Sequence, residues 1–218
     1  MNQPKAVIFD MDGVLFDTER VYLDSYIEAA AEYALADIRE ISLACIGRPT
    51  AETRELFLKA YGSDFPYDAF FEKAKAAAQK RLQNGYPLKP GVTELLEALS
   101  EHGIPAAIAS STSTKSVVKT LMRSQLIHYF RHIVGGDMVR KGKPDPEIYL
   151  TAAALMQLSP EDCLVLEDSP VGIRAACDAG MTTIMVPDLI PPDESLRTVT
   201  AAVVPSLRDV GVLLGLYQ

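Results

Sequence analysis

Cysteine is scarce in this sequence, with three copies among 218 residues. Cys45, Cys163 and Cys177 are odd in number, widely spaced and set in apolar stretches. A disulfide framework or a cysteine-rich metal site would need paired or closely spaced cysteines. The pattern therefore favours reduced thiols in a hydrophobic core.

Runs of basic residues are also missing. Lysine and arginine number 21 against 29 aspartates and glutamates, the formal net charge is -8, and the basic residues are scattered. Nothing here suggests a nucleic-acid-binding surface, so any anionic substrate must be held by local groups. The composition, 48% hydrophobic and 23% charged, is typical of a globular protein with one large core or a core plus a subdomain.

The sequence shows no long apolar segment near its first residue. The opening, MNQPKAVIFDMDG, has only a short apolar run at positions 6–9 before Asp10. A secretory signal or a membrane span needs a much longer run. We therefore expect a cytoplasmic protein without a membrane partner.

Short aliphatic and β-branched runs indicate buried parallel strands. They lie at residues 6–9, 104–109, 133–134, 163–166 and 182–186, with a weaker one at 201–204. Helical patterns alternate with them at residues 92–100, 114–124, 146–157 and 171–179. This alternation predicts an α/β fold, doubly wound around a mainly parallel sheet.

The first two strands are unusually far apart. About 90 residues separate them, whereas a crossover between parallel strands needs only about a dozen. The intervening stretch reads as helices at residues 19–33, 51–61 and 67–83. We therefore predict a helical cap, residues 18–87, inserted into a core formed by residues 1–17 and 88–218, with hinges near 16–18 and 85–90.

Two aspartates follow the first predicted strand in the segment FDMDGVLFDTE. If the chain stays extended, Asp10 and Asp12 point the same way and share one pocket. Like charges this close need a cation between them, and Mg²⁺ prefers such oxygen ligands. A plain Asp-Gly turn is the alternative, whereas an EF-hand loop is excluded because its twelfth position would be Val21.

Potential phosphate ligands follow the second strand and precede a predicted helix. Ser110 and Ser111 stand at the carboxyl end of the strand, where hydroxyls and helix N–H groups suit a phosphate. Helix capping is the alternative role of such serines. Lys143 lies in a loop before Pro144 and can offer a compact positive charge, unless it is merely solvated.

A second acidic pair closes the fourth strand. Glu167 and Asp168 follow the run CLVL directly. Helix capping explains one acid, and metal ligation explains two. Because the carboxyl ends of parallel strands share one edge of a sheet, the acids and the phosphate ligands are expected to converge there.

Four segments in this order resemble the motifs of the haloacid dehalogenase superfamily. They are DMDGVLFDTE, the Ser110 region, GKPDPEIY with Lys143, and LEDSPVGIRAACDAGM. The resemblance covers essentially the whole chain and is strongest to the phosphatases of the superfamily that carry a helical cap. It implies a Rossmann-like core and phosphoryl transfer, since members that cleave carbon–halogen bonds lack the second aspartate.

The resemblance also implies roles for individual residues. Asp10 would attack phosphorus to form an aspartyl-phosphate, while Asp12 would act as general acid and base. Mg²⁺ would be held by Asp10, by the backbone carbonyl of Asp12 and by Asp168, with Glu167 acting through water. Ser110, Ser111 and Lys143 would bind the phosphoryl group.

The subfamilies that the chain resembles differ in substrate. They are the sugar-phosphate phosphatases, the pseudouridine-5′-phosphate phosphatases, whose motif resembles DTERVY here, and β-phosphoglucomutase. The mutase needs a histidine and an arginine where Tyr22 and Thr50 stand, although Arg48 is near. The resemblance thus favours a hydrolase of a small phosphate monoester, with a mutase and a non-catalytic binding protein as alternatives.

Cap residues close to the first motif are candidates for contacting the leaving group. They are Glu19, Arg20, Arg48 and Thr50. Surface solvation or pairing along a helix would explain the same residues. We expect the protein to be a monomer or a weak dimer.

Overall fold

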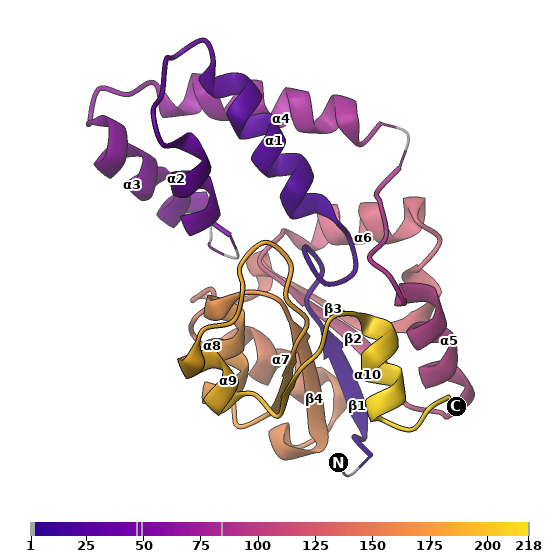
Figure 1. Cartoon of the computed structure of the whole chain (residues 1–218). Helices are drawn as coiled ribbons and strands as arrows, with labels where there is room; N and C mark the ends of the chain where they lie inside the picture. Colours follow the sequence, from indigo (N-terminus) through magenta and orange to yellow (C-terminus); the bar gives the residue numbers. More distant parts are fainter. Residues whose placement is uncertain (1–2, 47, 49, 84, 218) are drawn as a thin grey trace.

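The computed structural model describes residues 3–46, 48, 50–83 and 85–217, with the side chain of Thr50 outside the described part. Figure 1 shows an α/β core with a layer of helices above one end of its sheet. The chain enters this helical cap after the first strand and returns to the core before the second. All the helices of this layer lie between the first and second strands in the chain order.

The core is built on a parallel sheet, which contains six strands in the described part of the chain. Their order is β3-β2-β1-β4-β5-β6. The bounds are Ala6–Phe9 (β1), Ala106–Ser110 (β2), Phe130–Gly135 (β3), Cys163–Glu167 (β4), Thr182–Met185 (β5) and Ala202–Val203 (β6). The order reverses beside β1, which is where parallel α/β sheets bind ligands.

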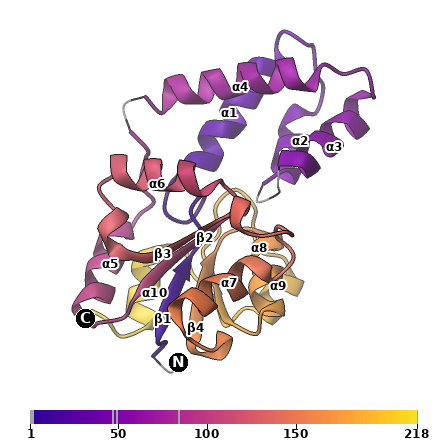
Figure 2. The same cartoon turned by 180° about the vertical axis from the view of Figure 1, so that it is seen from behind.

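Helices cover both faces of this sheet (Figures 1 and 2). One face carries α5 (Val92–Glu101), α6 (Thr114–Arg123) and α10 (Leu207–Leu213). The other carries α7 (Glu147–Met156) and α8 (Pro170–Asp178), with α9 (Glu194–Val199) packed against α8. Short 3₁₀ turns lie at Ile127–Tyr129, Gly136–Met138 and Pro160–Asp162.

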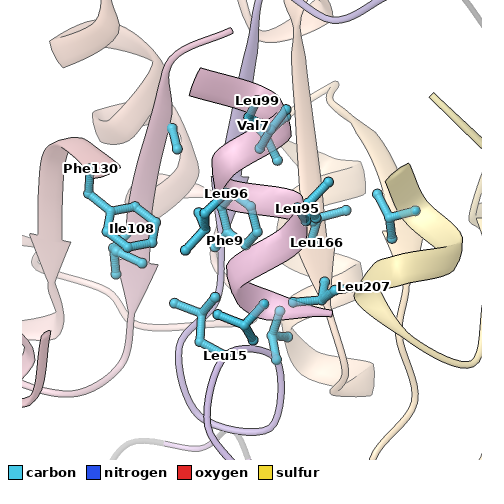
Figure 3. Close-up of a cluster of buried hydrophobic side chains, with 14 of the residues drawn as sticks. Val7, Phe9, Leu15, Leu95, Leu96, Leu99, Ile108, Phe130, Leu166 and Leu207 are labelled. Carbon is cyan, nitrogen blue, oxygen red and sulfur yellow. The ribbon is translucent and has the colours of Figure 1, made fainter. Parts of the chain in front are cut away.

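Strand alternation divides the core into two clusters. Val7 and Phe9 point to the face covered by α5, as Figure 3 shows, whereas Ala6 and Ile8 point to the face covered by α7. All four side chains of β1 are buried, which explains why its sequence is a continuous apolar run. The carboxyl end of β1 is thereby fixed between its neighbours.

The cap has an aromatic core of its own. Its helices are α1 (Thr18–Ala30), α2 (Ile38–Ala44), α3 (Thr50–Tyr61) and α4 (Tyr67–Arg81), and α1 packs along α4. The ring of Phe57 contacts five aromatic rings, those of Tyr26, Tyr61, Phe65, Tyr67 and Phe70. Among the described residues, no helix is both long and apolar enough to span a bilayer.

Two linkers join the cap to the core side by side. Phe16 forms an isolated bridge with Leu88, and the Asp17 N–H donates to the Pro87 carbonyl at 2.9 Å. The Lys89 ammonium then donates to Asp188, in the loop after β5, at 2.7 Å. The second linker therefore contacts the first linker on one side and the loop after β5 on the other.

The observed elements differ from the predicted ones in a few places. The second strand begins at Ala106 and not at residue 104, because the Ile104 N–H closes the end of α5 on the Leu99 carbonyl. The third strand spans six residues and not two, because the exposed Arg131 interrupts the run of apolar residues from which strands were predicted. Helices α2, α9 and α10 were not predicted at all, since each has only six or seven residues.

Candidate active site

The candidate site lies where β1, β2 and β4 end, below the cap. A pocket of about 920 Å³ opens there. Core residues form its floor, among them Asp10, Asp12 and Asp168, while α1 and α4 of the cap and α6 of the core form its walls. The sequence-predicted residues of three separate motifs therefore meet in one pocket.

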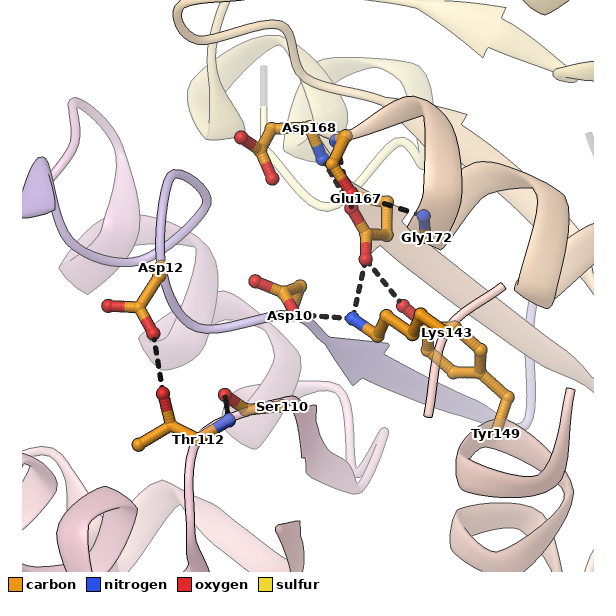
Figure 4. A network of polar contacts seen from close by, with 10 residues as sticks. Asp10, Asp12, Ser110, Thr112, Lys143, Tyr149, Glu167, Asp168 and Gly172 are labelled. Carbon is orange, nitrogen blue, oxygen red and sulfur yellow. Dashed lines mark hydrogen bonds and ion pairs between the residues drawn. The ribbon is translucent and has the colours of Figure 1, made fainter. Parts of the chain in front are cut away.

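Asp10 stands at the end of β1 and is almost fully buried. Its backbone N–H donates to the Leu166 carbonyl of β4 at 3.0 Å, which fixes its height in the sheet. Its carboxylate oxygen Oδ1 contacts the ammonium of Lys143 (Figure 4). Burial raises the pKa of Asp10 to about 7, and the Lys143 ammonium limits the rise.

Lys143 lies between two carboxylates. Its side chain is 1% exposed, and its ammonium donates to Glu167 Oε1 at 2.5 Å as well as to Asp10. Burial by itself lowers the pKa of Lys143, but the carboxylates of Asp10 and Glu167 outweigh this effect and raise the pKa well above its usual range. A solvated loop lysine is thus ruled out, because this lysine is a buried cation aimed at Asp10.

The carboxylate of Glu167 is occupied by donors from the protein. Oε1 accepts from Lys143 and from the Tyr149 hydroxyl, at 2.9 Å for the latter. Oε2 accepts from the Asp168 N–H and the Ser169 N–H, each at 2.9 Å, and from the Ser169 hydroxyl at 3.0 Å. Five donors fix this side chain, so its oxygens face Lys143 and the start of α8 and not the open pocket.

Asp12 is held by two threonine hydroxyls from different parts of the chain. Thr18, the first residue of α1, donates to Oδ1 at 2.5 Å, and Thr112, after β2, donates to Oδ2 at 3.1 Å. Met11 between the two aspartates is buried in the core. Burial raises the pKa of Asp12, while these two hydrogen bonds oppose the rise.

Asp168 faces Asp10 across the floor of the pocket. Gly13 has a positive φ of 85°, and a Cβ at Gly13 would lie 2.2 Å from Asp168 Oδ2. The loop after β1 therefore approaches Asp168 as closely as only glycine permits. Burial, together with the charges of Glu167 and Asp10, raises the pKa of Asp168 well above its ordinary value.

The floor residues suit a small hard cation. Buried acids that repel one another are stabilised by a divalent cation, and Mg²⁺ is commonly bound through one or two carboxylates with water and substrate oxygens. Among the described residues, no three His, Cys, Asp or Glu side chains cluster in a metal-binding arrangement. The fit is thus to a site of two carboxylates, those of Asp10 and Asp168, completed by backbone, water and phosphate oxygens.

The two predicted serine ligands line the same pocket. Ser110 is buried, and its hydroxyl accepts from the Thr112 N–H at 3.1 Å. In that contact the Ser110 oxygen is the acceptor, so the hydroxyl keeps its own hydrogen to donate. Ser111 follows it on the pocket wall.

The predicted cap residues divide into two groups. Glu19, Tyr22 and Arg48 line the pocket, and desolvation raises the pKa of Glu19 well above its usual range. The Arg48 guanidinium is engaged within the cap, by the Ala44 carbonyl at 2.9 Å and by Glu52 at 3.1 Å. Arg20 does not line the pocket and pairs with Asp17, while the side chain of Thr50 lies outside the described residues.

Sequence reasoning missed several residues of the site. Thr18, Thr112 and Tyr149 each donate to a carboxylate that it had identified. Thr18 and Tyr149 lie within or beside recognisable motifs, so a search for hydroxyl donors near those motifs could have found them. The cationic side of the pocket, Lys119 and Arg123 on α6, carried no signal because exposed basic residues on a helix are common.

Comparison with known proteins gives relatives over nearly the whole chain. A phosphorylated carbohydrates phosphatase of Thermotoga maritima is 35% identical over 180 residues, 83% of this chain and 83% of that protein. A β-phosphoglucomutase of Bacillus subtilis is 33% identical over 84% of this chain and 83% of its own length. The crystal structure of CbbY from Rhodobacter sphaeroides in complex with phosphate is 26% identical, with a TM-score of 0.77 over 95% of this chain and 96% of that one.

Comparison with protein-family models indicates the same family as these relatives. The model of haloacid dehalogenase-like hydrolases matches residues 7–186, which include all four motifs. The resemblance inferred from those motifs and the predicted fold class are both confirmed. This chain belongs to the haloacid dehalogenase-like hydrolase family.

Proposed function

We propose that this phosphatase hydrolyses small phosphate monoesters, either sugar phosphates or nucleotide-like metabolites, with Mg²⁺ and through an aspartyl-phosphate on Asp10. The observation that carries the proposal is the contact between Asp10, which lines the floor of a capped pocket, and the buried ammonium of Lys143. The relative named as a phosphatase of phosphorylated carbohydrates supports the substrate class.

The side chains on the pocket floor suit two successive displacements at phosphorus. The Asp10 carboxylate attacks phosphorus, and the bond to the ester oxygen breaks as Asp12 delivers a proton to that oxygen. Asp12 then removes a proton from water, which attacks the aspartyl-phosphate and releases inorganic phosphate. Lys143 and Ser110 donate to the phosphoryl oxygens, where electrostatic assistance matters most in this reaction.

Three oxygens would hold the cation: carboxylate oxygens of Asp10 and Asp168 and the backbone carbonyl of Asp12. When bound, Mg²⁺ would offset the repulsion between the Asp10 carboxylate and a phosphate dianion. Glu167 is left out of this set as a direct ligand, because both its oxygens already accept hydrogen bonds from the protein.

The cap wall would meet the leaving group. Glu19 lines the pocket, and the structure gives its carboxylate no hydrogen-bond donor among the described residues. A sugar hydroxyl would provide such a donor. Arg48 lies on the same wall, although its guanidinium is turned to Glu52.

The proposal is tested by phosphate release from a panel of phosphorylated sugars and nucleotides in the presence of Mg²⁺. Asp10→Asn should lower kcat by about 10³-fold or more, because it removes the nucleophile. Chelation of divalent cations should abolish turnover, and added Mg²⁺ should restore it.

The matched control for this experiment is Asp24→Asn. Asp24 is exposed on α1, and the same change of charge there should leave kcat unaltered. Wild-type turnover that survives in Asp10→Asn would disprove the aspartyl-phosphate mechanism.

Isomerisation of a phosphosugar is the second candidate, because a relative named β-phosphoglucomutase is 33% identical. Tyr22 lines the pocket at the position where the mutase resemblance calls for a histidine, so hydrolysis is favoured. Incubation with β-glucose 1-phosphate and a glucose bisphosphate, followed by phosphorus NMR, separates the two reactions. Inorganic phosphate is the product expected here, and glucose 6-phosphate without phosphate release would favour the mutase.

A further inference from the structure

Tyr149 lies behind the site, on α7, and reaches it only through other residues. Its side chain is fully buried, and its hydroxyl donates to Glu167 Oε1 at 2.9 Å. Its ring centroid lies 5.0 Å from the Lys143 ammonium, within the range of a cation–π contact. Figure 4 shows Tyr149, Lys143 and Glu167 converging from α7, the preceding loop and β4.

Lys143 needs such support because its side chain is long and flexible. A lysine has several rotatable bonds, and each must be fixed to aim the ammonium at one point. Two carboxylate oxygens receive the ammonium, Asp10 Oδ1 and Glu167 Oε1. The position of Lys143 therefore depends on how firmly Glu167 is oriented.

The orientation of Glu167 is fixed from two sides. The start of α8 supplies three donors to Oε2, through the Asp168 N–H and through the N–H and hydroxyl of Ser169. On the other oxygen, Oε1, the Tyr149 hydroxyl is the donor beside Lys143. Without that hydroxyl, Oε1 would be left with the lysine alone.

We propose that Tyr149 is a positioning residue that holds the Lys143 ammonium against Asp10, with its hydroxyl acting through Glu167 and its ring acting directly on the cation. The effect on turnover rests on the proposed function, since Lys143 would bind the phosphoryl group. Phenylalanine would keep the ring and the packing but would lose the hydrogen bond. The contribution of the hydroxyl can thus be separated from that of the ring.

The first test is steady-state kinetics of Tyr149→Phe on the best substrate of the panel. Loss of a hydrogen bond to a charged group should lower kcat roughly tenfold. KM should change little, since the lysine is needed most as charge redistributes in the transition state. Tyr67→Phe is the matched control, because the Tyr67 hydroxyl is also buried but has no hydrogen-bond partner among the described residues. The kcat of this variant should stay at the wild-type value.

A double-mutant cycle tests the route through Glu167. The effects of Tyr149→Phe and Glu167→Gln on kcat should be far from additive, because both act on one ammonium. Additive effects, or a wild-type kcat in a folded Tyr149→Phe variant, would overturn the proposal. A lower melting temperature with unchanged kcat would show a structural role only and would overturn it too.

The position of the ammonium can also be observed without turnover. In ¹⁵N NMR of lysine-labelled protein, the buried Lys143 should give a slowly exchanging ammonium signal, assigned by its loss in Lys143→Met. The signal should shift and broaden in Tyr149→Phe and should stay unchanged in Tyr67→Phe. An unchanged signal in Tyr149→Phe would refute the proposal even if no substrate is found, so its failure differs from a failure of the proposed function.

Discussion

At the scale of single residues, Gly172 determines how close α8 can approach the end of β4. A Cβ at Gly172 would lie 1.7 Å from Glu167 Oε1 and 2.0 Å from its carboxyl carbon. The Glu167 side chain thus occupies the space that any other residue at position 172 would need. Glu167 contacts Lys143, and Lys143 contacts Asp10, so two residues connect this glycine to Asp10.

Gly172→Ala is therefore expected to displace Glu167 and lower kcat by about 10- to 100-fold. The free energy of unfolding should fall by about 2 kcal/mol, since the added methyl group overpacks a buried site. Both values can be measured, by phosphate release and by urea denaturation.

Gly180→Ala is the matched control at the other end of the same helix. Gly180 has a positive φ of 76°, and no atom of the described residues lies within 4 Å of the position that a Cβ would take. Its replacement should cost stability through backbone strain but leave kcat unchanged. Equal loss of kcat in both variants would argue against displacement of Glu167.

The residues that the sequence could identify were those whose chemistry is unusual at a strand end. Asp10, Asp12 and Asp168 line one pocket, and the buried Lys143 ammonium contacts Asp10. Thr112 could not be identified in this way, since a threonine is ordinary in a loop or a helix cap. Only the fold shows that it lies beside Asp12, 100 positions earlier in the chain.

At the scale of elements, the second linker is fixed to the core by an ion pair. The side chain of Lys89 is 16% exposed and that of Asp188 is 2% exposed. The second carboxylate oxygen of Asp188 has no hydrogen-bond partner in the part of the chain that the structure describes. The Lys89 ammonium thus compensates for the loss of hydration of this buried carboxylate. Removing one partner of a buried pair costs far more than removing both.

We expect Lys89→Met to lower the free energy of unfolding by about 3 kcal/mol, because it leaves the Asp188 charge buried and unpaired. The double variant Lys89→Met, Asp188→Leu should recover most of this loss. Lys141→Met breaks an exposed pair with Asp145 and should change stability by less than about 1 kcal/mol. Urea denaturation of the four proteins decides, and a Lys89→Met variant as stable as Lys141→Met would refute the expectation.

The elements that the sequence predicted well were those with one dominant pattern. The buried strand β1 was predicted with its observed bounds, because four apolar residues end at an aspartate. The strand β3 lies at the edge of the sheet and mixes exposed and buried positions, so only its most apolar part, residues 133–134, was predicted as a strand. Tertiary packing, which a single sequence does not display, decides such cases.

At the scale of the whole molecule, cap and core have separate hydrophobic clusters. The cap cluster is centred on Phe57, whereas the core clusters lie on the two faces of the sheet. Six of the nine tyrosines, at positions 22, 26, 33, 61, 67 and 86, lie within residues 18–87, and the chain has no tryptophan. Tyrosine fluorescence therefore reports mainly on the cap.

Phe57→Ala should destabilise the cap by about 4 kcal/mol, since it opens a cavity among buried rings. In urea, the change in tyrosine fluorescence should then precede the loss of far-ultraviolet circular dichroism. Phe9→Ala in the core is the comparison, and it should move both signals together. Coincident transitions in Phe57→Ala would show that cap and core unfold as one unit.

The central place of β1 has a consequence for how the protein is made. This strand is synthesised first, yet its partners β2 and β4 lie at 106–110 and 163–167. The cap, contiguous in sequence and with its own core, leaves the ribosome in between and can fold before the sheet exists. An apolar strand that ends at Phe9 must then wait unpaired until its first partner, which begins at Ala106, is translated. We therefore expect the nascent protein to depend on a chaperone that shields β1.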